Sequence, residues 1–292
     1  MNQDQINEIV AEVQAEYPKL NWPEPTLEPV WFGRRPENLI PGSKAIVNTK
    51  DGEVFGVCTD MYKILRHEVC IHILKEALQT VDGFGEAQVC PSLMSGGAKL
   101  KVAVKFPGCE YILKPGTHEF FKSDVIIPKM DVFSSYDLSW KFGGRWGAFQ
   151  QTCSNGAGVW KTFVNYAKRH LQSLMPTDIR DSITEGMSVF TDQVDMWKKW
   201  TETFITREVY DNTWEALPFS AKEKEKIEAL PQTGTTFRLE DLRGRDVLGL
   251  DLWTFNSILT QFATHEVKSE LRRVDLEPQI AKAIEMTYNK VR

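Results

Sequence analysis

The chain of 292 residues lacks several features that would assign it to a class of proteins at once. No uninterrupted apolar run approaches the ~20 residues that a membrane-spanning helix needs, and the polar start has no basic-then-apolar leader. Its five cysteines are odd in number and widely scattered, which fits neither a disulfide framework nor a zinc knuckle. We therefore expect a cytoplasmic protein whose thiols are reduced and lie in the core.

Common catalytic signatures are absent as well. Neither the G-x-x-x-x-G-K-S/T loop of nucleotide hydrolysis nor a metalloprotease HExxH occurs, and the two histidines nearest in sequence are five residues apart, which does not place them on one helical face. The sequence thus predicts no catalytic residue, no metal site and no cofactor. Acid pairs such as Glu240 and Asp241, or Asp246 and Asp251, leave a metal-dependent nuclease open as an alternative.

Positive charge is unevenly distributed along a chain whose net charge is −5. Between Lys99 and Arg180 there are twelve lysines and arginines against six acids, so the remainder of the chain is strongly acidic. Such an asymmetry is expected when one surface meets a polyanion and the rest keeps the protein in solution.

The first half of the chain shows both strand and helix patterns. Apolar spacing predicts a helix over 5–17, and five prolines in the next two dozen residues predict an extended connector or arm. Further expected elements are strands at 44–49 and 53–59 around an Asp51-Gly52 turn, a helix over 61–79 capped by Asp60, and strands at 87–94, 98–106 and 124–134. Pro91 would confine its strand to a sheet edge.

Lysines alternate with apolar residues in the strand expected at 98–106. Leu100, Val102 and Val104 occupy one set of positions, and lysines fill most of the other. Because side chains alternate across a strand, this pattern predicts one buried face and one basic face.

The second half is predicted to be mainly helical. A glycine-bearing loop through Gly147 precedes a helix over 157–170, and further helices are expected over 178–204, 220–230, 248–270 and 278–290. The fold class is therefore α+β, an antiparallel sheet with packed helices followed by a helical C-terminal third. Three regions are expected: an N-terminal helix and proline-rich arm at 1–43, an α+β core at 44–176, and a helical region at 177–292.

Residues 134–156 concentrate aromatic rings, cations and glycines. Tyr136, Trp140, Phe142, Trp146 and Phe149 lie among Lys141, Arg145 and glycines 143, 144, 147 and 156. Cations can follow the phosphates of a single strand while flat rings stack on its unpaired bases, and glycine lets the backbone approach closely. This segment predicts a single-stranded nucleic-acid site.

Four short stretches carry a family resemblance: Phe55-Gly56-Val57-Cys58-Thr59-Asp60 with Tyr62, Ser135-Tyr136-Asp137 with Ser139, Arg145 with Cys153-Ser154-Asn155-Gly156, and Trp253-Thr254-Phe255-Asn256 with Thr260 and His265. They resemble the phage/plasmid-like protein family catalogued as domain of unknown function 932, in the same order over residues 30–270. The chain departs from that pattern at Ala157 and Gly158, where the family has bulkier apolar residues.

This resemblance implies a protein of phages, prophages or plasmids, acting in the host-cell cytoplasm. The order of hairpin, helix and strands before a basic helix is also similar to the cores of phage single-strand annealing proteins such as RecT. That second similarity concerns the fold alone.

The leading hypothesis is an ATP-independent single-stranded DNA-binding protein that promotes annealing in phage or plasmid recombination, assembled as a homo-oligomeric ring or filament. The expected DNA-binding residues are Lys99, Lys101, Lys105, Trp140, Lys141, Arg145, Trp146, Asn155, Lys161, Lys168 and Arg169. One alternative is a metal-dependent nuclease or other nucleic-acid-processing enzyme that uses acids of the C-terminal third. Another is a phage protein that binds a host protein, with Trp197, Trp200 and Trp214 as anchors.

Overall fold

The structure, a computed structural model, describes residues 1–33, 38–80, 87–114, 124–150, 176–231, 237–246 and 248–291. It has antiparallel sheets and a helical C-terminal region, which confirms the α+β class. The described residues form two compact units, the first from 1–104, 131–145 and 176–185, the second from 105–130, 146–150 and 186–291. The expected region boundaries after residues 43 and 176 stay a prediction.

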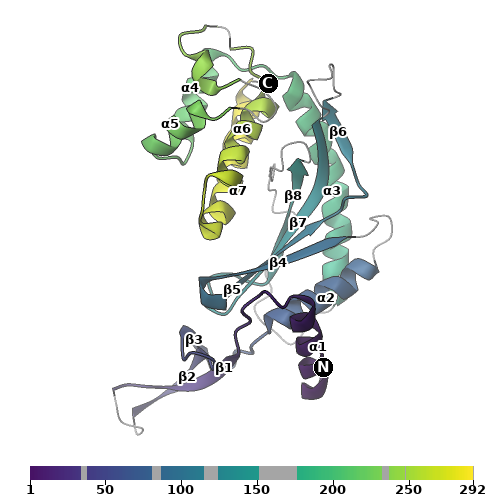
Figure 1. The fold of residues 1–292 in the computed structure, drawn as a ribbon, viewed down its shortest axis with the longest axis vertical. Coiled ribbons are helices and arrows are strands. Elements are labelled where there is room, and N and C mark those ends of the chain that lie inside the picture. Colours follow the sequence, from purple (N-terminus) through teal and green to yellow (C-terminus); the bar gives the residue numbers. More distant parts are fainter. Residues whose placement is uncertain are drawn as a thin grey trace. The chain divides into compact units, whose positions relative to one another are not determined.

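A three-stranded antiparallel sheet belongs to the first unit (Figure 1). It consists of β1 (Pro25–Trp31), β2 (Leu39–Asn48) and β3 (Val54–Thr59) in that order. The β2–β3 hairpin around Gly52, whose φ is +79°, confirms the prediction. The proline-rich segment was expected as a connector and instead supplies β1, because an edge strand tolerates residues that lack an N–H.

Two helices of the first unit, α1 (Gln3–Glu16) and α2 (His67–Gln79), pack against each other. The prediction that α2 begins at residue 61 with an Asp60 cap is wrong. Tyr62 packs against the hydrophobic cluster around Tyr136 instead of forming a first turn. The Tyr136 hydroxyl accepts a 2.8 Å hydrogen bond from the backbone N–H of His67, which satisfies an otherwise unpaired donor and fixes the helix start there.

The larger sheet contains β4 (Gln88–Met94), β5 (Lys99–Lys105), β6 (Tyr111–Lys114), β7 (Asp124–Ser135) and β8 (Gly143–Gln150). Its order is β4-β5-β7-β6, and β8 pairs with β7. The strand that carries Pro91 lies at the edge, as its proline predicts. Strand β6 had no counterpart in the prediction.

The expected loop through Gly147 is wrong, since these residues form strand β8. Trp146 and Ala148 are buried there, so the segment is held by packing rather than left as a glycine loop. The helix expected over 157–170 lies outside the described residues.

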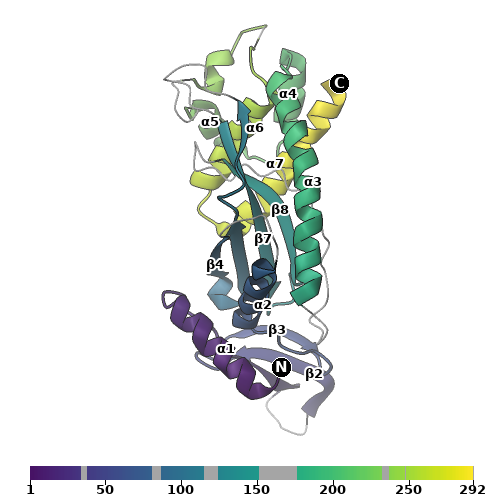
Figure 2. The same cartoon turned by 90° about the vertical axis from the view of Figure 1, so that its right-hand side faces the viewer.

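The helices of the second half are α3 (Pro176–Glu202), α4 (Arg207–Ala216), α5 (Ala221–Ala229), α6 (Leu252–His265) and α7 (Glu270–Val291). Helix α4 had not been predicted, and α7 runs through Pro278 instead of beginning there. Ile280 and Ile284, just beyond the proline, are fully buried, so tertiary packing outweighs the local cost of proline. Figure 2 shows α6 and α7, which pack together.

A core rich in aromatic side chains fills the second unit. Phe190, Trp197, Trp200, Trp253 and Phe255 are each at most 1 % exposed. Across the part of the chain that the structure describes, no helix has the length and apolar character to cross a membrane.

Candidate nucleic-acid interface

The alternation expected for β5 is confirmed on its apolar side. Leu100, Val102 and Val104 are 0 % exposed, as inward-facing residues of a strand should be. The opposite side is less open than predicted, because Lys101 is only 8 % exposed.

Lys101 belongs to a buried charge cluster that crosses three neighbouring strands. Its Nζ lies 3.5 Å from Oδ2 of Asp131 on β7, and Nη2 of Arg145 on β8 lies 3.6 Å from the same oxygen. Asp131 is 0 % exposed, and the Arg145 guanidinium also stands 5.0 Å from the ring centroid of Phe133. Buried charges must be paired, so Lys101 and Arg145 are tied to the structure instead of lining an open groove as predicted.

The connection between β7 and β8, residues 136–142, is held together by side chains. The Ser135 hydroxyl accepts a hydrogen bond from the Trp140 N–H (2.9 Å). The same hydroxyl lies 3.1 Å from the carbonyl oxygen of Trp140. The Asp137 carboxylate accepts from both the N–H and the hydroxyl of Ser139. Leu138, at φ +63°, takes the left-handed conformation that completes the turn.

This turn orients Trp140 beside two lysines. The Trp140 ring meets Phe133 edge-on at 5.2 Å, and Nζ of Lys99 lies 4.7 Å from its centroid. Lys141 follows directly and is exposed, while Trp140 remains partly exposed. One partly exposed ring and two lysines therefore lie together in the first unit, although the Lys99 side chain is only 13 % exposed.

Asp137 keeps Lys99 in place. Its Oδ2 lies 3.4 Å from the Lys99 ammonium. Burial alone would raise the pKa of Asp137, but hydrogen bonds from Ser139 and Ser135 and the charge of Lys99 outweigh it and hold that pKa below its ordinary value. The carboxylate is therefore ionised at neutral pH, and Lys99 is partly neutralised before any phosphate approaches.

The prediction that Trp146 stacks on a base is wrong. Its side chain is 1 % exposed and stacks on Phe106 with ring centroids 5.4 Å apart. The indole also lies against Gly186 of α3, where only a glycine leaves room for it. Neither partner is near Trp146 in sequence, so no local pattern distinguished it from Trp140.

The structure brings together Lys99, Trp140 and Lys141 from the expected set. Lys105, the last residue of β5, belongs to the second unit. Asn155, Lys161, Lys168 and Arg169 lie outside the described residues.

Three of the four acids considered for a nuclease, Glu240, Asp241 and Asp251, have structural roles. Asp251 caps α6, since its carboxylate accepts from the N–H and the hydroxyl of Thr254. The Asp241 carboxylate accepts from the Arg238 N–H, and Glu240 pairs with the Arg238 side chain. Within the described ranges, no three His, Cys, Asp or Glu side chains are grouped as a metal site would require.

Other expected side-chain roles change as well. Trp197 and Trp200 are 0 % exposed and cannot anchor a partner protein. Cys58 and Cys70 are buried as expected, and burial raises the pKa of Cys70 to about 12, but Cys90 is exposed, so the prediction of a core thiol is wrong there. Cys153 lies outside the described residues.

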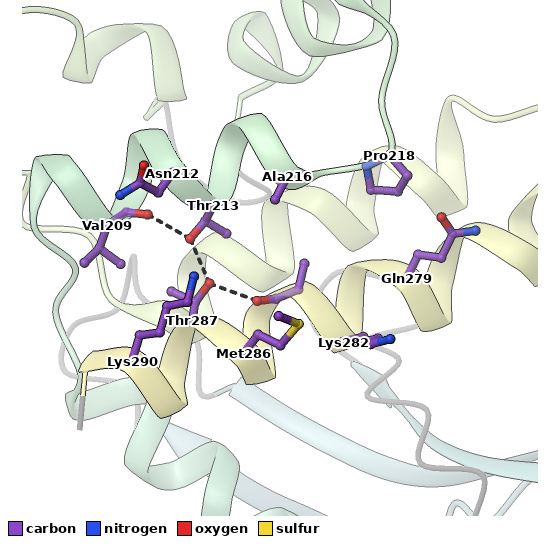
Figure 3. A pocket seen from close by; sticks show the side chains of 11 residues that line it. Val209, Asn212, Thr213, Ala216, Pro218, Gln279, Lys282, Met286, Thr287 and Lys290 are labelled. Carbon is purple, nitrogen blue, oxygen red and sulfur yellow. Dashed lines mark hydrogen bonds between the residues drawn. The ribbon is translucent and has the colours of Figure 1, made fainter.

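A groove of about 330 Å³ lies between α4 and α7 in the second unit (Figure 3). The hydroxyl oxygens of Thr213 and Thr287 join the two helices at its base, 2.7 Å apart. Lys282 and Lys290 of α7 line it together with apolar side chains such as Met286. The groove contains none of the residues predicted for DNA binding.

Comparison with known proteins does not place the chain in a group: no family model, no curated protein and no solved structure matches it.

Proposed function

We propose that this chain is a single-stranded DNA-binding protein that promotes strand annealing in phage or plasmid recombination without ATP. The observation that carries the proposal is the cluster at the β7–β8 turn, where Lys99 stands 4.7 Å from the centroid of a partly exposed Trp140 and the exposed Lys141 follows. A base can stack on the exposed part of the indole while the ammonium group of Lys141 meets a flanking phosphate.

The resemblance to the phage/plasmid-like protein family supports a mobile-element origin for the chain. The excess of positive charge between residues 99 and 180 supports a polyanionic ligand, because the remainder of the chain is acidic. Annealing requires two strands to be held close to each other. We expect a homo-oligomeric ring or filament of this chain to hold them.

Binding is measured by the fluorescence anisotropy of a labelled oligothymidine at several salt concentrations. We expect affinity to fall with salt, and the Lys141→Ala variant to lower the salt slope by about 0.7, the value for one single-strand phosphate contact. Trp140→Ala should weaken binding by about 1–3 kcal/mol, roughly 5- to 150-fold.

The matched control is Lys224→Ala, because Lys224 also lies over an indole, that of Trp214, at 5.9 Å, but in the second unit. It should leave binding unchanged. A protein that binds no single strand at low salt, or whose affinity ignores Trp140 and Lys141, contradicts the proposal. Complementary labelled strands incubated with the protein and magnesium should anneal, and cleavage of those strands would favour a nuclease instead.

A further inference from the structure

Tyr136 is the first residue of the connection that carries Trp140 and Lys141, and its side chain is fully buried. Its backbone N–H donates a 2.7 Å hydrogen bond to the carbonyl oxygen of Ala98, directly before β5. The connection between β7 and β8 is therefore fastened at its start to the strand that carries Lys99.

The Tyr136 ring stacks on two other rings. Its centroid lies 3.9 Å from that of His67 and 5.8 Å from that of Phe55, and both pairs are close to parallel. Nε2 of His67 lies 3.1 Å from the carbonyl oxygen of Gly97, so the histidine ring is itself held in place. Such stacked pairs add stability beyond the area that they bury, and they give the Tyr136 ring a defined place in the core of the first unit.

The Tyr136 hydroxyl adds a polar contact inside this cluster. It accepts a 2.8 Å hydrogen bond from the backbone N–H of His67, the first residue of α2. Burial is the main cause that raises the pKa of this hydroxyl well above its ordinary value, so the hydroxyl stays neutral. One hydrogen bond thus joins the start of α2 to the start of the connection.

Strand β3 also contacts the start of the connection. A Cβ on Gly56 would lie 3.5 Å from the Asp137 Cα and 3.5 Å from the Tyr136 carbonyl oxygen, which is ordinary van der Waals contact. The β3 backbone at Gly56 therefore packs closely against the first two residues of the connection. This packing leaves room for a methyl group and little more.

Two short links lead from Tyr136 towards the partly exposed ring of Trp140. Ser135, which is fully buried and precedes Tyr136, accepts a hydrogen bond from the Trp140 N–H. Asp137, which follows Tyr136, accepts hydrogen bonds from the N–H and the hydroxyl of Ser139. The position of Trp140 is therefore coupled to that of Tyr136 through both of its sequence neighbours.

We propose that Tyr136 is a positioning residue of the single-stranded DNA site: its contacts in the core hold Trp140 and Lys141 where they bind the strand. A side chain that is 0 % exposed does not meet a base itself. Tyr136 acts by preorganisation, because ordering a loose segment costs free energy that binding must otherwise supply. This role rests on the proposed function, since it concerns the same site.

Tyr136→Phe removes the hydroxyl and keeps the ring, so it tests the link to α2 alone. We expect it to weaken oligothymidine binding by about 2- to 10-fold, the equivalent of one hydrogen bond. The salt slope should stay that of the wild type, because no phosphate contact is lost. The matched control is Tyr210→Phe, which removes the hydroxyl of a tyrosine that is 5 % exposed in the second unit and should bind like the wild type.

A fluorine NMR spectrum reports the surroundings of Trp140 without DNA. The protein is labelled with 5-fluorotryptophan, and the resonance that Trp140→Phe removes belongs to Trp140. Tyr136→Phe should shift or broaden that resonance, whereas Tyr210→Phe should leave it in place. Because the spectrum is recorded on the folded protein, a loss of stability alone does not move the resonance.

Gly56 offers a second pair of variants that leave Tyr136 itself unchanged. Gly56→Ala places a methyl group in ordinary contact with the connection and should behave like the wild type. Gly56→Leu adds carbons that must displace the connection. It should therefore weaken binding and shift the Trp140 resonance, as Tyr136→Phe does.

A wild type that binds no single strand overturns the proposed function and the positioning role together. A wild type that binds, while Tyr136→Phe and Gly56→Leu both keep its affinity and its Trp140 resonance, overturns the positioning role alone. So does an equal loss of affinity in Tyr136→Phe and Tyr210→Phe, because a general loss of stability would then explain it.

Discussion

Neighbours that are distant in sequence decide what each residue of the β7–β8 segment can do. Trp140 and Trp146 are six residues apart and look alike in the sequence. One sits in a turn under a lysine, and the other is sealed between Phe106 and Gly186. Lys99 and Lys101 both pair with an aspartate, but Lys101 meets Asp131, which is fully buried in the sheet, whereas Lys99 meets Asp137, which lies in the connection between β7 and β8.

Replacing Gly186 by alanine tests how rigidly Trp146 is held. A Cβ at this position would overlap the indole nitrogen of Trp146 and its neighbouring carbons. Alanine favours a helix by about 1 kcal/mol over glycine, yet the stacked indole has no room to move, so the clash should prevail. We expect Gly186→Ala to lower the free energy of unfolding by about 1–3 kcal/mol in denaturant titrations.

Glu185→Ala is the control for this substitution, because Glu185 precedes Gly186 on α3 and is exposed. It should change stability by less than about 0.5 kcal/mol. A Gly186→Ala protein that is more stable than the wild type would mean that the indole lies elsewhere.

At the scale of elements, helix starts are fixed by side chains that satisfy the first N–H groups. Ser220 and Glu223 form a capping box at α5, and Asn2 and Gln5 do the same at α1. The beginning of α6 at Leu252, four residues later than its apolar pattern predicted, follows from the Asp251 cap.

Asp251→Ala should therefore destabilise the second unit by about 0.5–2 kcal/mol, the usual cost of losing a cap. Thermal unfolding followed by circular dichroism measures the loss. Asp246→Ala is the matched control, because Asp246 is the other acid of the pair considered for metal binding and is exposed. The assignment of Asp251 as a cap is contradicted if both substitutions lower the stability equally. It is also contradicted if magnesium stabilises the wild type and each substitution abolishes that effect.

At the scale of the whole molecule, acid should weaken the fold through several carboxylates together. A hydrogen bond to Lys75 is the main cause that lowers the pKa of Glu16 below its ordinary 4.5. At Glu223 burial opposes the shift, but bonds to Ser220 and Arg272 prevail and lower its pKa as well. Asp137 is lowered too, so three acids in the two units act in the same direction.

Since these folded-state pKa values lie below the unfolded ones, their stabilisation is complete above about pH 4.5 and is lost as the pH falls through the folded values. We expect the melting temperature to stay level between about pH 7 and 5 and to fall below that range. Glu16→Gln should reduce part of this acid-induced drop in melting temperature. When Lys75 is already replaced by methionine, Glu16→Gln should change the melting temperature much less. A melting temperature that rises on acidification contradicts this account.

Much of the fold was predictable because its patterns are local. The period of two in β5, the Asp51-Gly52 hairpin, the edge position of Pro91 and the long apolar stripes of α1 and α3 all follow from neighbouring residues. The failures share a different cause: β8 looked like a glycine loop, and α7 like a helix that begins at Pro278. In both cases burial against distant residues outweighed local propensity.

The sequence by itself determined the α+β class, the alternation that buries one side of β5, and the concentration of rings and cations between residues 134 and 156. Only the tertiary structure decided which of those side chains remain accessible, leaving Trp140 partly open and enclosing Trp146, Lys101 and Arg145. The physical reason is that charge and aromaticity belong to single residues, whereas burial depends on which strands and helices meet. Pairing of β5 with β7, which brings Lys101 to Asp131, joins segments that are distant in the sequence, so no local pattern encodes it.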